Sequence, residues 1–129
     1  MGAVAAERYY DISRLLDFYG DMLSERQRLA MKLYYNDDLS LSEVAQELGI
    51  SRQGVRASLK RSEDILLEME SKLRLAERFD KTLSEFKKLR VFAANALEQS
   101  RENGDKNMER FAQEIVELAE ALENNIDQY

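Results

Sequence analysis

The sequence contains no cysteine and no histidine. These absences exclude disulfide bonds, thiolate or imidazole metal sites, cysteine nucleophiles and serine–histidine triads. A metal ion could bind only through carboxylates, and the acidic residues do not show the spacing of a carboxylate site. The sequence also has no glycine-rich phosphate loop and no nucleophile paired with a base. We therefore expect no enzyme activity, no catalytic residue, no metal and no cofactor.

Proline and tryptophan are also absent, and only five of the 129 residues are glycine. A chain with so few helix breakers, rich in Leu, Glu, Ala, Arg and Lys, is typical of an almost entirely helical protein. No apolar run approaches the ~20 residues that cross a bilayer, and no signal-peptide core follows Met1. The composition predicts an all-α, cytoplasmic protein without membrane insertion.

Charge is distributed unevenly along the chain. Residues 1–62 contain nine Lys/Arg and nine Asp/Glu, whereas residues 63–129 contain ten and sixteen and account for the whole net charge of −6. Such asymmetry indicates two roles within one chain. We expect a functional domain over residues 1–66 and a helical tail over residues 67–129, with the acidic side of the tail facing solvent.

The first 38 residues predict two helices. Apolar residues at helical spacing predict the first over residues 11–19. Ser24 can cap the second, because its hydroxyl can accept a free backbone N–H. The apolar residues of that helix include Leu29 and Leu33, and it precedes a turn at residues 36–38.

The most informative segment runs from residue 40 to residue 61. The sequence SLSE at residues 40–43 is a capping box for a helix that reaches residue 48. Gly49 permits the left-handed backbone that ends this helix. Ser51 caps a second helix, which begins at the next residue. Two short capped helices around a glycine turn are typical of a helix-turn-helix.

The second helix of this motif carries four cations and no acid between Ser51 and Arg61. The N-terminal residues of a recognition helix reach base edges in the major groove, where Arg binds guanine and Gln binds adenine. We therefore expect Arg52, Gln53 and Arg56 to read bases. Phosphate contacts, which position the protein without specifying sequence, are expected from Ser51, Lys60 and Arg61. The alternative is a solvated basic face without function.

The tail is the expected dimerisation element. The pattern predicts a bend between residues 74 and 80, a turn at residues 102–105 and a final helix with a heptad repeat. The apolar positions of that repeat are Met108, Phe111, Ile115, Leu118, Leu122 and Tyr129. Four phenylalanines are too many for exposed helices: Phe79, Phe86, Phe92 and Phe111. The tail either folds back as an antiparallel hairpin or pairs across a two-fold axis. We favour a homodimer, because helix-turn-helix proteins usually read paired half-sites.

Residues 9–75 resemble the YlxM-like family, most specifically over DFYGDML, LYYNDDLSLSEVA and LGISRQGVR. These are small bacterial proteins expected to bind DNA and encoded beside the genes of the signal recognition particle. The segment LSLSEVAQELGISRQGVRASLKR is also similar to the helix-turn-helix of region 4 of sigma factors. The promoter-reading residues of region 4 match Arg52, Gln53 and Arg56, whereas Gly54 replaces a long polar residue.

The resemblance implies a helix-turn-helix fold, DNA as partner, a role in transcription regulation and a link to the signal recognition particle pathway. The alternative is a protein- or RNA-interaction module of the signal recognition particle or the transcription machinery, without sequence-specific DNA binding. The overall acidity of the chain favours this alternative, because a DNA-binding domain usually has a broad basic surface.

Overall fold

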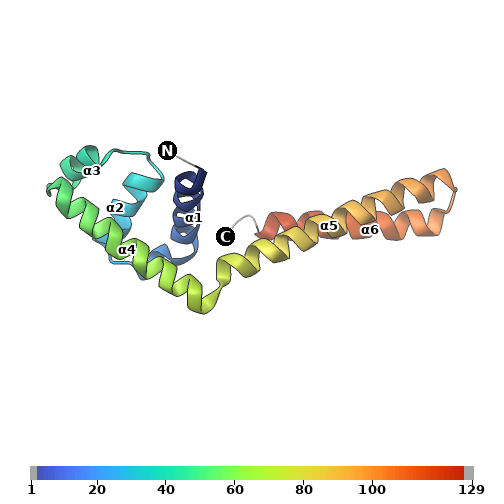
Figure 1. Ribbon diagram of the computed structural model, residues 1–129. Coiled ribbons are helices and arrows are strands. Elements are labelled where there is room, and N and C mark those ends of the chain that lie inside the picture. The colour runs from blue at the N-terminus through green and yellow to red at the C-terminus, as the bar shows by residue number, and fades with distance from the viewer. Residues whose placement is uncertain (1–2, 127–129) are drawn as a thin grey trace. The chain divides into compact units, whose positions relative to one another are not determined.

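The computed structural model describes the backbone of residues 3–126 and the side chains of residues 11–126. Within these residues all regular elements are helical, which confirms the predicted all-α fold (Figure 1). The elements are α1 (Ala3–Tyr19), the 3-10 turn η1 (Gly20–Met22), α2 (Glu25–Tyr35), α3 (Leu41–Leu48), α4 (Arg52–Leu73), α5 (Leu75–Glu102) and α6 (Lys106–Ile126). No helix in this part of the chain is long and apolar enough to cross a membrane.

The chain divides into two units, Met1–Ala76 and Glu77–Tyr129. The first unit therefore ends ten residues after the boundary at residue 66 that the sequence suggests. The cause is α4, which continues without a breaker to Leu73, and Ala76, which is buried in the first core.

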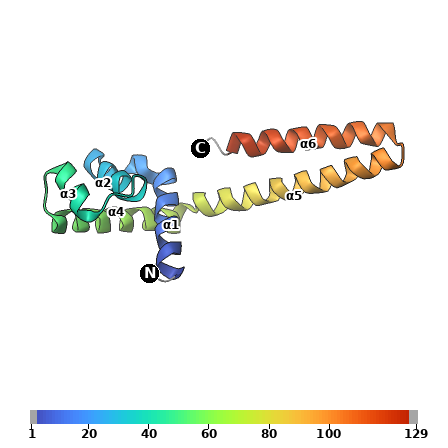
Figure 2. The ribbon, with the colours of Figure 1, turned by 90° about the horizontal axis from the view of Figure 1, so that it is seen from above.

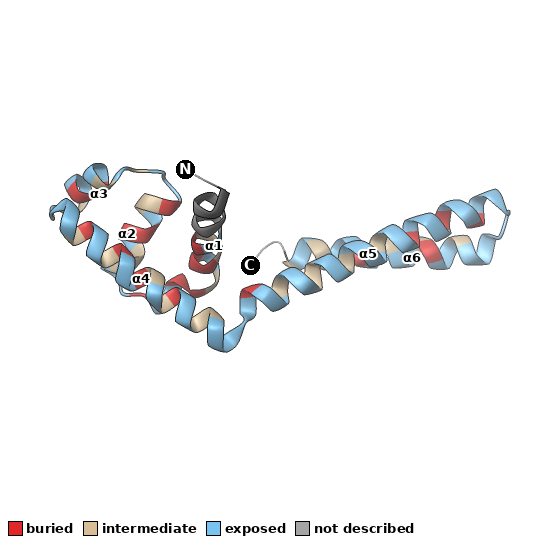
Figure 3. Ribbon diagram, in the orientation of Figure 1, coloured by how far each residue is buried: buried red, intermediate tan, exposed pale blue. Residues whose placement is uncertain are grey.

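In the first unit, α4 packs against each of α1, α2 and α3 (Figure 3). Its residues Val55, Leu59 and Leu66 recur at helical spacing and are buried. The remaining large buried side chains come from the other elements: Ile12, Leu15, Leu16, Tyr19, Leu23, Met31, Tyr35 and Val44. Helix α4 is thus the common support on which α3 is held.

Helix α2 begins after the predicted cap Ser24, whereas α1 does not begin at the predicted residue. The hydroxyl of Ser24 accepts the N–H of Gln27 at 3.2 Å, and the Gln27 side chain accepts the N–H of Ser24 at 3.1 Å. Helix α1 begins at Ala3 rather than at residue 11. Residues 3–10 contain three alanines, which favour a helix, and neither glycine nor proline, which would interrupt it.

Helix α4 ends at Leu73, and its C-cap residue Arg74 is a non-glycine residue with φ 57° and ψ 32°, inside the predicted bend region. The buried Tyr19 hydroxyl donates to Glu70 Oε1 at 2.6 Å. The first two N–H groups of α5 then find side-chain acceptors: Leu75 donates to Tyr19 Oη and Ala76 donates to Glu70 Oε1, both at 3.1 Å. Burial, together with the hydrogen bond to Glu70, raises the pKa of Tyr19.

In the second unit, α5 and α6 lie side by side as an antiparallel hairpin (Figures 1 and 2). Gly104, with φ 69°, makes the turn, and Asp105 Oδ1 accepts the N–H of Met108 at 3.1 Å. Arg90 Nε and Glu123 Oε1 join the two helices at 2.7 Å. Tyr129, the last position of the predicted heptad, lies outside the described residues.

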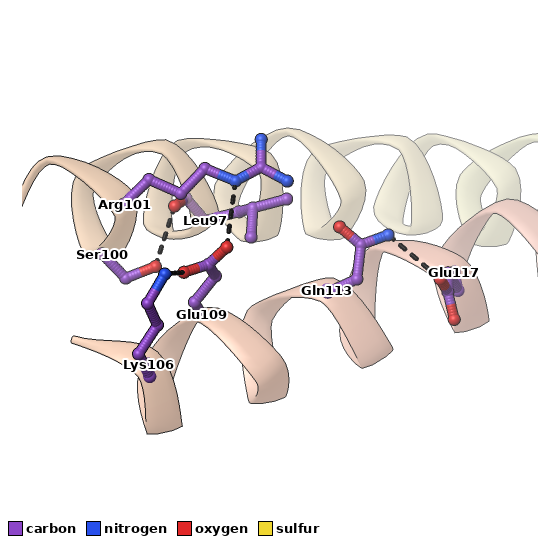
Figure 4. A network of polar contacts seen from close by, with 7 residues as sticks. All are labelled: Leu97, Ser100, Arg101, Lys106, Glu109, Gln113 and Glu117. Carbon is purple, nitrogen blue, oxygen red and sulfur yellow. Dashed lines mark hydrogen bonds and ion pairs between the residues drawn. The ribbon is translucent and has the colours of Figure 1, made fainter. Parts of the chain in front are cut away.

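Polar contacts hold the turn end of the hairpin (Figure 4). Glu109 on α6 forms two ion pairs: its Oε1 lies 3.4 Å from Arg101 Nε on α5, and its Oε2 lies 3.6 Å from Lys106 Nζ. Ser100 Oγ donates back to the carbonyl of Leu97 at 2.8 Å, so this buried hydroxyl is satisfied within its own helix. Glu109 is mostly covered, and its two cations are exposed.

Candidate nucleic-acid interface

Helix α3 begins and ends at the predicted residues. The Ser40 hydroxyl accepts the N–H of Glu43, and the Glu43 carboxylate accepts the N–H of Ser40, both at 3.1 Å. This reciprocal pair satisfies two backbone donors that the helix itself cannot use. Val44 and Ala45, in the middle of the helix, are buried, and the small Ala45 side chain allows a close approach to α4.

A three-residue turn joins α3 to α4. Gly49 has φ 66° and ψ 33°, the left-handed conformation predicted for it, and Ile50 donates to the carbonyl of Ala45 at 3.1 Å. The space around a Cβ at Gly49 is empty to 4 Å, so the backbone conformation alone requires glycine. Ser51 caps α4, because its hydroxyl accepts the N–H of Gly54 at 3.0 Å.

Glycine is favoured at position 54 by limited space, and not by backbone conformation as at Gly49. A Cβ at this position would lie 3.2 Å from the Ser51 hydroxyl and 3.7 Å from Ile50 Cδ1. The missing side chain therefore leaves room for the capping hydroxyl and for the residue that packs beneath the turn.

The outward side of α4 carries the predicted site residues, all of which are exposed: Ser51, Arg52, Gln53, Arg56, Lys60 and Arg61. At about 100° of rotation per residue, Arg52, Gln53, Arg56 and Lys60 fall within an arc of about 100° on the helix surface. Arg61 lies about 80° beyond that arc. The helix thus brings four of the predicted side chains, three of them cations, onto one strip and places the fourth cation, Arg61, beside it.

Most of these cations are not neutralised within the chain. Among the described residues, Arg52, Arg56 and Arg61 have no ion-pair or hydrogen-bond partner for their side chains, and the first turn of α4 contains no acid. Lys60 differs, because its Nζ lies 2.9 Å from Asp64 Oδ1. Both members of that pair are more than half exposed, so the pair contributes at most about 0.5 kcal/mol.

Two residues of this surface were not part of the sequence prediction. Asp64 places a negative charge next to Lys60, and the spacing of four residues was the signal that could have revealed it. Ala57 is exposed between Gln53 and Arg61, close to the point of α4 opposite the core. Its small side chain leaves the outward face of the helix low, and only its position relative to the buried residues identifies it.

A capped helix, a glycine turn and a second capped helix with free cations on its outward side define a helix-turn-helix protein. Similarity to known proteins agrees with this assignment. Residues 6–108 match the family UPF0122, described as "Putative helix-turn-helix protein, YlxM / p13 like". The UPF0122 protein YlxM of Bacillus subtilis is 36% identical over 120 residues, which cover 93% of this chain and 97% of that protein.

A second relative, the UPF0122 protein BH2485 of Halalkalibacterium halodurans, is 39% identical over 109 residues, covering 84% of this chain and 88% of that protein. The UPF0122 protein ABC2295 of Shouchella clausii is 49% identical over 81 residues, which cover 63% of this chain and 74% of that protein. The chain therefore belongs to the UPF0122 family of YlxM-like helix-turn-helix proteins.

Proposed function

We propose that this protein binds double-stranded DNA with the N-terminal half of α4 in the major groove, and that it acts in transcription regulation. One observation carries the proposal: Arg52 and Arg56 are exposed without a partner among the described residues, at the capped and acid-free start of the second helix of a helix-turn-helix. Free guanidinium groups at that place are the groups that such a fold presents to base edges.

Within this proposal Arg52, Gln53 and Arg56 read bases. A guanidinium can donate two hydrogen bonds to O6 and N7 of guanine, and the amide of Gln can pair with N6 and N7 of adenine. Each such contact discriminates between bases by about 1–3 kcal/mol. The small exposed Ala57, next to Gln53 on the helix surface, fits an apolar contact with a thymine methyl group.

Ser51, Lys60 and Arg61 contact phosphates in the same proposal. The Ser51 hydroxyl accepts a bond from Gly54, which leaves its own proton free to donate. The N-terminus of α4 adds backbone N–H groups and the positive end of the helix dipole. Lys60 is two turns further along and can exchange its weak pair with Asp64 for a phosphate.

The small number of cations predicts modest affinity and steep salt dependence. Fluorescence anisotropy of the full chain with a labelled duplex, at about 50 and 200 mM salt, measures both. Lys60→Ala should weaken binding to all sequences about equally and lower the salt slope by about one. Lys72→Ala is a matched control: Lys72 lies on the same helix and pairs with Glu68 at 2.9 Å, but it is far from the recognition end.

A second candidate partner is an RNA or an acidic protein, including a component of the signal recognition particle as the family resemblance suggests. The net charge of −6 favours it, because a DNA-binding domain usually has a broad basic surface. Absence of duplex binding at about 50 mM salt, together with retention of RNA or an acidic protein that Arg56→Ala abolishes, would replace the DNA proposal with this one.

A further inference from the structure

Most of the fully buried side chains of α5 and α6 within the hairpin are small. The buried residues of the hairpin are Ala93, Leu97 and Ser100 on α5, with Ala112 and Ala119 on α6. Such residues let two helices approach closely but remove little apolar surface from water. Many of the large apolar side chains of the hairpin therefore remain partly or largely accessible.

Besides Val91, six large apolar side chains of the hairpin are exposed, with 44–68% of their surface accessible: Leu89, Phe92, Met108, Phe111, Ile115 and Leu118. The last four follow the spacing of a heptad seam along α6. This seam, which an amphipathic helix normally buries, is not the side that α6 turns toward α5.

The exposed side chains of the two helices share one face of the hairpin. Phe92 on α5 is rotated by about 100° from the buried Ala93, and Ile115 on α6 is rotated by about 60° from the buried Ala112, in the same sense along each chain. Because the helices are antiparallel (Figure 2), equal senses of rotation point to the same side of the hairpin. We call the six residues the apolar hairpin face.

The opposite side of the hairpin is polar. Arg101, Lys106 and Gln113 lie there, rotated from the buried residues in the other sense; the first two meet the carboxylate of Glu109 (Figure 4). The hairpin is thus a layer of two helices with one apolar and one polar side, like one half of a four-helix bundle.

The apolar hairpin face is large enough for a stable partner. Six side chains that each expose on the order of 100 Å² give roughly 600 Å², the upper end for a patch on a monomer and close to the ~800 Å² per partner of a standard interface.

We propose that this face binds the same face of a second copy of the chain, forming a four-helix bundle. Area favours a second copy, because two such faces together bury roughly 1,200 Å², the lower end of a specific, stable interface. A two-fold arrangement that sets α5 of one copy against α6 of the other covers the apolar hairpin face of both copies. Each copy offers both helices, so the pairing is reciprocal.

The test is the molar mass of the full chain without DNA, by sedimentation equilibrium. The account predicts a species of twice 15.0 kDa. Phe92→Lys and Leu118→Lys should each raise the dissociation constant of the dimer at least about tenfold, because each places a charge in the apolar contact. Both side chains are exposed in the single chain, so far-UV circular dichroism should show unchanged helix content.

Val91→Lys is the matched control. Val91 is 50% exposed beside Phe92, but one residue of rotation turns it away from the apolar hairpin face. It should leave the dissociation constant within about threefold of the original, less than ~0.7 kcal/mol. A mass of 15.0 kDa at concentrations of about 100 µM would overturn the proposal, as would equal effects of Val91→Lys and Phe92→Lys. Because no DNA is present, the result is independent of the proposed DNA binding.

Discussion

Replacing Gly49 by alanine should destabilise the first unit by about 1–2 kcal/mol. Gly49 has φ 66°, a conformation in which the Cβ of an L-residue meets its own carbonyl oxygen. No atom of the described part of the chain lies within 4 Å of the added Cβ, so no clash with such a neighbour adds to this backbone cost. Gly49→Asn should destabilise the first unit less than Gly49→Ala does, because asparagine tolerates the left-handed region better than alanine.

Urea unfolding followed by tyrosine fluorescence measures this loss selectively. Five of the six tyrosines belong to residues 1–76, and the chain has no tryptophan. Gly104→Ala is the control, since Gly104 has φ 69° and equally free space but lies in the second unit. It should leave the tyrosine transition unchanged. A tyrosine transition unaffected by Gly49→Ala would refute the left-handed turn between α3 and α4.

Three further predictions concern single groups. Ser62→Ala should stabilise the first unit by about 1 kcal/mol in the same urea assay, because the Ser62 hydroxyl is fully buried and has no hydrogen-bond partner among the residues that the structure describes. Tyr19→Phe should destabilise the first unit by about 1–3 kcal/mol, because it removes the hydroxyl that donates to Glu70 and accepts the N–H of Leu75. The raised pKa of Tyr19 adds a pH effect: the stability that its neutral hydroxyl contributes is complete below pH 10 and is lost as the pH rises through the raised pKa, a decline that Tyr19→Phe should lack. Asp64→Asn should tighten DNA binding about twofold to fivefold in anisotropy titrations, since it frees Lys60 and removes a negative charge; weaker binding would contradict the phosphate role of Lys60.

Features whose physics lies within one helical turn were predictable from the sequence. The caps at Ser24, Ser40 and Ser51 and the left-handed Gly49 depend on groups three or four residues apart, and the structure shows each of them. The exposed positions of Arg52, Gln53 and Arg56 follow from the same periodicity.

Features that depend on distant residues were not predictable. The bond between Tyr19 and Glu70 joins residues 51 positions apart, and it is what fixes the first N–H groups of α5. Among the apolar residues of α2, Leu29 is 48% exposed, whereas Ala30 and Met31 are buried in the core. Periodicity shows that a helix has an apolar side, but the choice of buried residues depends on the neighbouring helices.

The tail shows the same limit. The sequence left open a hairpin or a two-fold pair, and the structure forms the hairpin while leaving Phe92 and Phe111 at least half exposed. The two alternatives are therefore compatible, because folding back buries the alanines and leaves the heptad seam free for a second copy.

The central claim is that α4 reads DNA sequence, and selection from a random duplex pool followed by sequencing tests it most directly. The account predicts a salt-sensitive retained fraction with an enriched motif in two related halves, about one helical turn apart. Arg52→Ala should relax the preference at one position of each half, whereas the control variant Lys72→Ala should select the same motif as the original chain. Retention without any enriched motif, or no retention at about 50 mM salt, would contradict base reading by this helix.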